Sequence, residues 1–280
     1  MNSPPLWINV NGSLLPAGTP FLSAGSRAFR YGDGIFETML VQQDHIRLAD
    51  YHFDRLEHGL RYIRYPLPPG ITRERLNREI LELCDQNEHR DLSRARLVLF
   101  RGEGGIFDKV PADPQYVIET WPLPPASPEL NQHGLVVDVY SGGTKSCDGL
   151  ANLKSNNYLI YALAAGWATD AGLDDCLVLN SRGTLADTTI ANLFYCQNGQ
   201  WYTPPLSDGC VAGVMRRYLL TAMPAAGFPV SERTTTIDDL LNAEEVFLTN
   251  AIRGIRWVAA FRDTRYSNTL TTALHRKLLL

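Results

Sequence analysis

Several features are missing from this sequence of 280 residues, and each absence argues against a class of protein. No stretch approaches the roughly 20 consecutive apolar residues of a membrane-spanning helix, so we expect no membrane association. The N-terminus has no basic segment followed by an apolar one, so we expect no signal peptide. The net charge is −4 and basic residues form no run, which gives no case for nucleic-acid binding.

Cysteine is also sparse: the chain has five, scattered and without a Cys-x-x-Cys pair. This distribution is typical of reduced thiols and argues against a disulfide framework or a zinc site. We therefore predict a cytoplasmic protein that holds no metal. No Ser-His-Asp or His-Glu-x-x-His arrangement stands out, and His45 and His52 are more typical of surface and packing residues than of catalysts.

What is present is an ordinary globular composition, with 45% hydrophobic and 20% charged residues, enough for one large domain or two medium ones. Four prolines fall between Trp121 and Gly134, and proline fixes the backbone and removes a hydrogen-bond donor. We therefore predict an N-terminal α/β domain over residues 1–121, a proline-rich linker over 122–130, and a C-terminal domain over 131–280.

Local patterns predict a mixture of strands and helices. Asn11-Gly12 predicts a tight hairpin turn, and helical spacing predicts helices over 48–63 and 71–87, capped by Asp50 and Thr72. The other expected elements are strands at 35–41, 95–102, 115–121, 135–140, 176–180, 183–187, 192–196, 200–203 and 245–250, and helices over 157–170, from about 214, from a cap at Thr236 and from a cap at Ser267. This mixture predicts an α/β fold.

The stretch from Lys154 to Phe194 contains one lysine in forty-one residues. Lys154 lies between an apolar approach and a helix start, and a lysine amine in apolar surroundings becomes neutral and nucleophilic, which suits Schiff-base chemistry. A carboxylate further along, Asp187, can hold the pyridinium nitrogen of pyridoxal phosphate. The alternatives are a surface lysine ahead of a helix and a turn residue ahead of Thr188.

Three features can bind an anion such as a phosphate. The glycine-rich segment 209–217 leads into a helix, whose first N–H groups and dipole attract negative charge. Residues 249–251 end a strand and can offer backbone and hydroxyl donors. Arg55 lies near the apolar face of a helix, where a phosphate can satisfy it. The alternatives are a plain helix start, a polar strand end, and a salt bridge of Arg55 with Glu57 or Asp54.

Arg30 and Arg101 adjoin glycine-rich turns after apolar segments, and either guanidinium can bind a carboxylate through two hydrogen bonds. We therefore predict that they bind the carboxylate of a substrate. Arg27, close by, is more typical of a structural turn residue.

These segments together resemble the class IV (fold type IV) pyridoxal-phosphate enzymes, a family that includes D-amino-acid and branched-chain aminotransferases and 4-amino-4-deoxychorismate lyase. The similar segments are FRYGDGIFET, YHFDRL, NLKSNNYL, LADTTIANLF, YTPPLSDGCVAGVMRR and LTNAIRGIRWV, in family order over nearly the whole chain. The resemblance implies two α/β domains with the cofactor between them, the C-terminal domain binding pyridoxal phosphate, and a homodimer.

The resemblance also implies roles for individual residues. Lys154 is the Schiff-base lysine and Asp187 the acid at the ring nitrogen. The other implied cofactor-binding residues are Arg55, Tyr158, Val214, Met215, Asn250 and Ala251. Phe36 lies at a substrate-side position of the family pattern, while Arg30 and Arg101 are our own candidates for binding the substrate carboxylate.

The chain departs from the family pattern at several positions. Asp187 replaces a glutamate, so we expect Asp187→Glu to keep or raise cofactor affinity. Met215 replaces a frequent threonine and is similar to the lyase. Ile106 stands where the D-amino-acid and lyase branches have a substrate arginine, and Phe36 replaces a frequent tyrosine.

The resulting prediction is a transaminase that moves an amino group between an amino acid, with a preference for D-amino acids, and a 2-oxo acid such as 2-oxoglutarate or pyruvate. The alternatives are 4-amino-4-deoxychorismate lyase, then a branched-chain aminotransferase. A fourth is a degenerate family member that binds or regulates without catalysis.

Overall fold

The computed structural model describes residues 6–65, 67, 70–108, 114–125 and 130–279. The chain forms two compact units. Unit 1 comprises residues 1–126 together with Lys154–Asn157, and unit 2 comprises 127–153 and 158–280. The segment predicted as the linker, 122–130, includes the division after residue 126, although residues 126–129 lie outside the described part. No local pattern predicted that Lys154–Asn157 would belong to the first unit.

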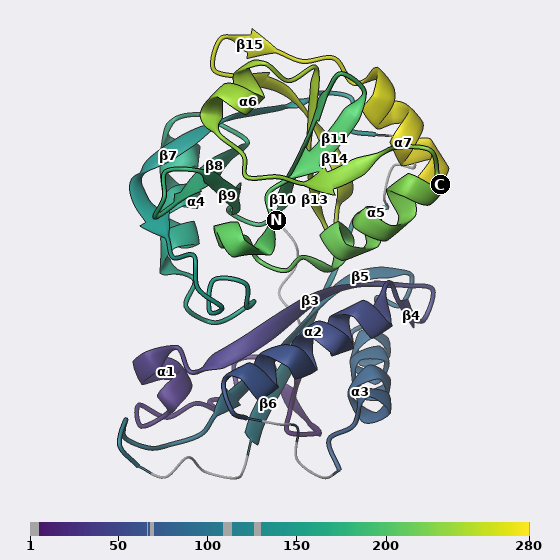
Figure 1. Cartoon of the computed structure of the whole chain (residues 1–280). Coiled ribbons are helices and arrows are strands. Elements are labelled where there is room, and N and C mark those ends of the chain that lie inside the picture. Colours follow the sequence, from purple (N-terminus) through teal and green to yellow (C-terminus); the bar gives the residue numbers. More distant parts are fainter. Residues whose placement is uncertain (1–5, 66, 68–69, 109–113, 126–129, 280) are drawn as a thin grey trace. The chain divides into compact units, whose positions relative to one another are not determined.

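Unit 1 is built on an antiparallel sheet of six strands in the order β2-β1-β6-β5-β3-β4 (Figure 1). The strands are β1 (Trp7–Val10), β2 (Ser13–Pro16), β3 (Gly34–Gln42), β4 (His45–Ile46), β5 (Leu92–Arg101) and β6 (Pro114–Pro122), and the helices are α1 (Arg27–Tyr31), α2 (Ala49–Tyr62) and α3 (Arg73–Gln86). Apolar side chains of β3 and β5, such as Met39 and Leu97, pack with Leu56 of α2 and Ile80 of α3 in one buried core.

The local predictions for unit 1 hold with one exception. Asn11 and Gly12 have φ values of 54° and 89°, as the predicted hairpin turn requires. The Thr72 hydroxyl accepts a hydrogen bond from the N–H of Arg75, as expected for the cap of α3. The cap predicted at Asp50 is wrong. The cap position is occupied by Leu48 and α2 begins at Ala49, two residues earlier than a cap at Asp50 would give, so Asp50 lies in the first turn, where its charge suits the helix dipole.

Unit 2 is built on a mixed sheet of nine strands in the order β12-β11-β10-β13-β14-β7-β8-β9, with β15 pairing β14 (Figure 1). The strands are β7 (Leu135–Lys145), β8 (Asp175–Asn180), β9 (Leu185–Thr188), β10 (Asn192–Gln197), β11 (Gln200–Thr203), β12 (Val230–Glu232), β13 (Glu245–Asn250), β14 (Gly254–Phe261) and β15 (Thr264–Arg265). The helices are α4 (Leu159–Asp170), η1 (Leu206–Asp208), α5 (Val214–Ala225), α6 (Ile237–Leu241) and α7 (Thr269–Leu279).

Two of the local predictions for unit 2 need correction. The strand predicted to end at Tyr140 continues to Lys145, which pairs with Asn180 of β8 after a register shift. This extension carries Lys145 into the interior. Ser267 does not cap α7, because the helix begins two residues later, at Thr269, and the N–H groups of Leu270 and Thr271 donate to the Glu245 carboxylate. The capping box predicted at Thr236 is present at the start of α6, and α5 begins at Val214 as predicted.

Among the described residues, none of the helices combines the length and the apolar character that a membrane span requires.

Candidate functional site

The segment that carries Lys154 is held by backbone pairing at the start of β3. The N–H of Phe36 donates to the carbonyl of Lys154 at 2.9 Å, and the N–H of Asn156 donates to the carbonyl of Gly34 at 3.0 Å. The Lys154 Nζ lies 4.3 Å from the centre of the Phe36 ring, a cation–π distance. Unit 1 therefore brings together two residues that the sequence predicted for the site, Lys154 and Phe36.

The next residue of β3, Glu37, points to the opposite face of the sheet, because side chains alternate along a strand. It meets α2, where it accepts from His52 Nδ1 at 2.6 Å and from Arg55 Nε at 2.7 Å. Burial raises the pKa of Glu37, but the charge of Arg55 and the bond from His52 outweigh it and lower that pKa to about 2. Glu37 is thus an ionised partner in a buried ion pair.

Arg55 was predicted to bind the cofactor phosphate, with a salt bridge to Glu57 or Asp54 as the alternative. Arg55 forms an ion pair with Glu37, and Glu57 and Asp54 both bind Arg73. Glu37 engages two nitrogens of the guanidinium and so fixes its orientation. The phosphate role of Arg55 stays a prediction.

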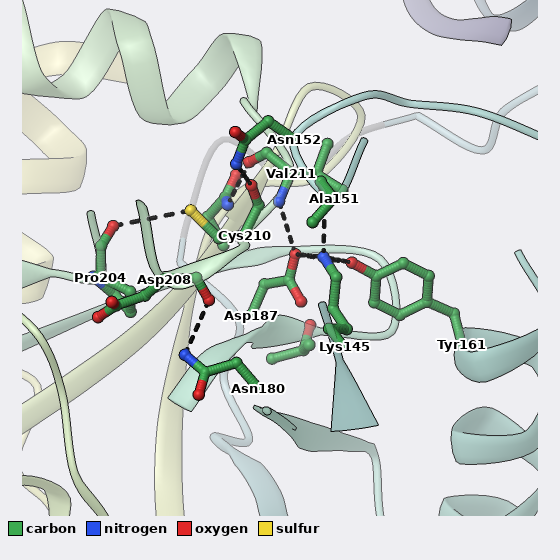
Figure 2. Close-up of polar contacts among 12 residues, drawn as sticks. Lys145, Ala151, Asn152, Tyr161, Asn180, Asp187, Pro204, Asp208, Cys210 and Val211 are labelled. Carbon is green, nitrogen blue, oxygen red and sulfur yellow. Dashed lines mark hydrogen bonds and ion pairs between the residues drawn. The ribbon is translucent and has the colours of Figure 1, made fainter. Parts of the chain in front are cut away.

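In unit 2 the predicted acid Asp187 lies in β9 and is 2% exposed. Three donors converge on its Oδ2 (Figure 2): Lys145 Nζ at 3.1 Å, Tyr161 Oη at 2.8 Å and the Val211 N–H at 2.8 Å. Its Oδ1 is buried and meets no donor within the described part of the chain. Burial raises the pKa of Asp187, and the adjacent Lys145 charge acts against that rise.

The amino end of α5 is open for an anion. Gly213 occupies the cap position and carries no side chain that could cap the helix, so the first N–H groups have no acceptor within the helix itself. Only glycine fits at 213, because a Cβ there would lie 1.9 Å from Oδ1 of Asn192. Asn192 Nδ2 in turn donates to the carbonyl of Val211 at 2.9 Å. These bonds hold Val214 and Met215, the predicted cofactor contacts, beside Asp187 and its three donors, Lys145, Tyr161 and Val211, which we call the Asp187 cluster.

The end of β13 adjoins the same place, since Thr249 is the register partner of Asn192 on β10. The Thr249 hydroxyl donates to the carbonyl of Gly254 at 2.8 Å, so this hydroxyl, predicted as a phosphate donor, is used within the turn. The Asn250 side chain accepts from the N–H of Arg253 at 2.8 Å and so closes the turn that contains Ala251. Backbone groups of this loop are what remains for a ligand.

These parts of unit 2 fit pyridoxal phosphate. The unpartnered Oδ1 of Asp187 suits a protonated ring nitrogen, and the open amino end of α5 suits a phosphate. Bonds through Val211 and Asn192 connect the two.

Tyr158 was also predicted to contact the cofactor. It precedes α4, and its hydroxyl donates to the carbonyl of Thr189 at 2.6 Å, two residues beyond Asp187. This bond ties the start of α4 to the loop that follows β9.

The two predicted substrate arginines have different surroundings. Arg30 is exposed, and its Nε donates to the carbonyl of Ala24 at 2.9 Å. Arg101 is buried: it binds Asp33 at 2.6 Å, donates to the carbonyl of Ile63 and stacks on Tyr65. These contacts use both terminal nitrogens of Arg101 within unit 1, so its predicted substrate role gains no support.

Lys145, Tyr161 and Glu37 were not predicted as site residues. Lys145 was assigned to a loop, because the polar run before it shows no strand pattern. A signal was nevertheless available: the sequence has only four lysines, so a buried one is unusual in this chain.

Comparisons with known proteins agree with this arrangement. The family model described as amino-transferase class IV matches residues 34–261. A putative branched-chain-amino-acid aminotransferase of Methanocaldococcus jannaschii is 29% identical, covering 86% of this chain and 83% of that protein. An aminodeoxychorismate lyase of Vibrio harveyi is 28% identical, covering 82% and 84%. The crystal structure of 4-amino-4-deoxychorismate lyase from Pseudomonas aeruginosa matches with a TM-score of 0.82 at 31% identity, covering 97% and 96% of the two chains.

Proposed function

We propose that this chain, which belongs to the class IV aminotransferase family, moves an amino group from an amino acid to a 2-oxo acid such as 2-oxoglutarate or pyruvate. The resemblance predicted from the sequence and the predicted α/β fold of fold type IV are both confirmed. Enzymes of this family use pyridoxal phosphate, and that is the cofactor of this enzyme.

One observation carries the proposal: a buried carboxylate with one open oxygen lies in the same unit as an uncapped helix start. Bound pyridoxal phosphate supplies an aldehyde for an amine and a ring that withdraws electrons. Oδ1 of Asp187 would hold the ring nitrogen. The N–H groups of Val214 and Met215 would hold the phosphate, where the dipole of α5 favours negative charge.

Four further residues complete the proposed cofactor site. Asn250 and Ala251 offer backbone donors to the phosphate, and Arg55 offers its guanidinium, held in orientation by Glu37. Tyr158 holds the loop after Asp187 through its bond to Thr189.

Lys154 is the proposed catalytic residue. Its backbone is fixed to β3, so its amine starts from a defined position. Its amine would hold the cofactor covalently and, when free, would take the proton from the substrate Cα as general base. Phe36 gives the amine an aromatic surface that excludes water on one side.

The test is a half-reaction. Purified protein loaded with pyridoxal phosphate is mixed with single amino acids, and 2-oxo acid formation and the cofactor spectrum are followed. Loss of the cofactor's absorbance together with 2-oxo acid release supports the proposal. Lys154→Ala serves as the control and should neither react nor retain cofactor after borohydride reduction. A wild-type protein that takes up no pyridoxal phosphate would contradict the proposal.

We carry forward the preference for D-amino acids, which now depends on Arg30. The other predicted substrate arginine, Arg101, is engaged by Asp33. Arg30 is exposed and has one backbone contact, so its terminal nitrogens are placed to orient a carboxylate. Parallel half-reactions with the D and L forms of alanine and glutamate test this preference, and faster reaction of the L forms would reverse it.

The second candidate is 4-amino-4-deoxychorismate lyase, which releases pyruvate from aminodeoxychorismate. Met215 favours it, together with 31% identity to the Pseudomonas aeruginosa lyase. Pyruvate formed from aminodeoxychorismate without any added 2-oxo acid would replace the transaminase proposal with this one. Branched-chain substrates are the third candidate, motivated by the similarity to the Methanocaldococcus jannaschii protein.

We also propose that the enzyme works in the cytoplasm as a homodimer. Sedimentation equilibrium of the purified protein tests the oligomeric state, and a mass of about 31.2 kDa would contradict the dimer.

A further inference from the structure

The Asp187 cluster contains a second buried lysine that the proposed reaction does not use. Lys145 lies at the end of β7 with 5% of its side chain exposed. Its amine donates to Oδ2 of Asp187 at 3.1 Å, to the Tyr161 hydroxyl, and to the carbonyl of Ala151 at 3.4 Å. These three acceptors account for the three N–H groups of an ammonium, so the position suits a charged lysine.

The donors around Asp187 are distributed unequally between its two oxygens. Lys145, Tyr161 and the Val211 N–H all meet Oδ2, whereas Oδ1 has no donor among the described residues (Figure 2). A carboxylate can rotate about its Cβ–Cγ bond, but three donors from three different elements prevent this. The cluster therefore favours one orientation of the carboxylate, in which one oxygen position is bound and the other remains available.

Two other titratable groups of the described chain face this carboxylate, Tyr161 and Cys210, and burial favours the neutral form of each. Burial raises the pKa of Tyr161, and the nearby Asp187 charge adds to that rise. Burial likewise raises the pKa of Cys210, on the loop before α5, to about 12. One positive and one negative group thus remain, Lys145 and Asp187, in a place that water does not screen.

We propose that Lys145 is a positioning residue: with Tyr161 it holds Asp187 by Oδ2, leaves Oδ1 for the ring nitrogen of pyridoxal phosphate, and by its positive charge weakens the protonation of that nitrogen. This inference rests on the role proposed above for Asp187. A carboxylate that already neutralises one cation attracts a second less strongly, so the ring nitrogen competes with Lys145 for the same negative charge. The cofactor of this enzyme is therefore a weaker electron sink than one held by an unpaired carboxylate.

The inference is tested on the protein loaded with pyridoxal phosphate that carries ¹⁵N at the ring nitrogen. The ¹⁵N resonance, followed against pH, reports how much of that nitrogen is protonated without any turnover. Lys145→Gln removes the charge but keeps a side-chain donor for Asp187. We expect the midpoint of the ring-nitrogen titration to rise by roughly one to three pH units, the range typical of a removed neighbouring charge.

Three variants separate charge from packing. Lys145→Arg keeps the charge and should keep the wild-type midpoint, and Lys277→Gln removes a lysine from α7, where its amine donates to Ala226, and should do the same. Tyr161→Phe removes an uncharged donor from Oδ2 and should shift the midpoint less than Lys145→Gln. If Lys145→Gln does not fold, Lys145→Met is titrated in its place with the same expected rise.

The outcomes distinguish this inference from the proposed function. A wild-type protein that loads cofactor on Lys154, with the same midpoint in wild type and Lys145→Gln, overturns the inference and leaves the proposed function intact. An equal shift in Tyr161→Phe and Lys145→Gln also overturns it, because donor number rather than charge would then set the protonation. A wild-type protein that takes up no cofactor contradicts both.

Discussion

Two buried carboxylates, Glu37 in unit 1 and Asp187 in unit 2, each lie beside a cation, yet their pKa values move in opposite directions. Burial raises the pKa of both. At Glu37 the bonds and charges of Arg55 and His52 prevail and lower it to about 2. At Asp187 burial prevails over Lys145.

The difference follows from how the oxygens are used. Arg55 meets both oxygens of Glu37, and His52 adds a third bond. At Asp187 all three donors meet one oxygen and the other meets none in the described residues. A carboxylate bound at both oxygens is a finished structural ion pair, whereas one bound at a single oxygen keeps a place for a ligand.

The largest effect on stability is expected at the ion pair of Glu37 and Arg55. Glu37→Gln removes the carboxylate that pairs with the Arg55 guanidinium in the interior of unit 1, which costs about 3 to 5 kcal/mol of the free energy of unfolding. Urea denaturation of the apoprotein measures this. The matched control is Glu82→Gln, which removes an exposed pair with Arg78 and should change stability by less than about 1 kcal/mol. Equal losses in the two variants would mean that Glu37 and Arg55 contribute no more than a surface pair.

The pH dependence of unfolding should separate the two acids. The Glu37 pKa is lowered from 4.5 to about 2, so its stabilisation is present above pH 4.5 and is lost as the pH falls toward 2. Since one pKa unit corresponds to about 1.4 kcal/mol, this amounts to about 3 kcal/mol. The Asp187 pKa is raised, so its stabilisation is present below its ordinary value of 3.8 and is lost as the pH rises through the folded-state pKa.

The measurement is the free energy of unfolding of apo wild type, Glu37→Gln and Asp187→Asn between pH 2 and 7. The advantage of wild type over Glu37→Gln should grow with pH, and its advantage over Asp187→Asn should shrink. Saturating pyridoxal phosphate should remove the second trend and leave the first. Trends of the same sign in both variants would show that the two carboxylates are equivalent.

Asp187→Glu tests how tightly the Asp187 cluster is packed. The sequence suggested that glutamate would keep or raise cofactor affinity, but the contacts reverse that expectation. An extra methylene would push the carboxylate out of reach of Lys145, Tyr161 and Val211 in a closely packed interior. We expect a loss of about 1 to 3 kcal/mol in apoprotein stability and weaker cofactor binding, measured by fluorescence titration. Asp138→Glu, a partly exposed acid paired with Arg262, is the control; unchanged affinity in Asp187→Glu would restore the original expectation.

A smaller effect on cofactor affinity is expected at the amino end of α5, which adjoins the Asp187 cluster and has no counterpart beside Glu37. Gly213→Ala places a Cβ against Asn192 and should displace the loop that carries Val211, with about a tenfold loss of cofactor affinity, or about 1.4 kcal/mol. Gly166→Ala in α4 meets nothing within 4 Å and should bind cofactor like wild type. Equal affinities in the two variants would show that the loop tolerates a side chain at 213.

The sequence predicted what local patterns encode. Turn residues, helix caps and apolar periodicity located most strands and helices, and short motifs singled out Lys154, Asp187 and the start of α5. It did not show which charges are buried together. The Lys145–Asp187 and Glu37–Arg55 pairs join residues 42 and 18 positions apart, and only the pairing of strands and helices brings them into contact.

Arg101 illustrates the same limit. Its place after an apolar segment and beside a glycine turn suits a substrate ligand, but its partner, Asp33, lies 68 positions earlier in the chain. Lys145 was missed for a related reason, because the polar end of β7 joins the sheet through its partner Asn180 rather than through its own pattern.

The four residues Lys154–Asn157 belong to unit 1, while the residues on both sides of them belong to unit 2. Unit 1 is therefore not one uninterrupted piece of the gene, and recombination at a single point between the units would separate β3 from the lysine that it holds. A chimera that takes its N-terminal unit from a relative must take residues 154–157 from the same parent. Inheritance of Lys154 thus follows the N-terminal unit, although this residue is encoded in the second half of the sequence.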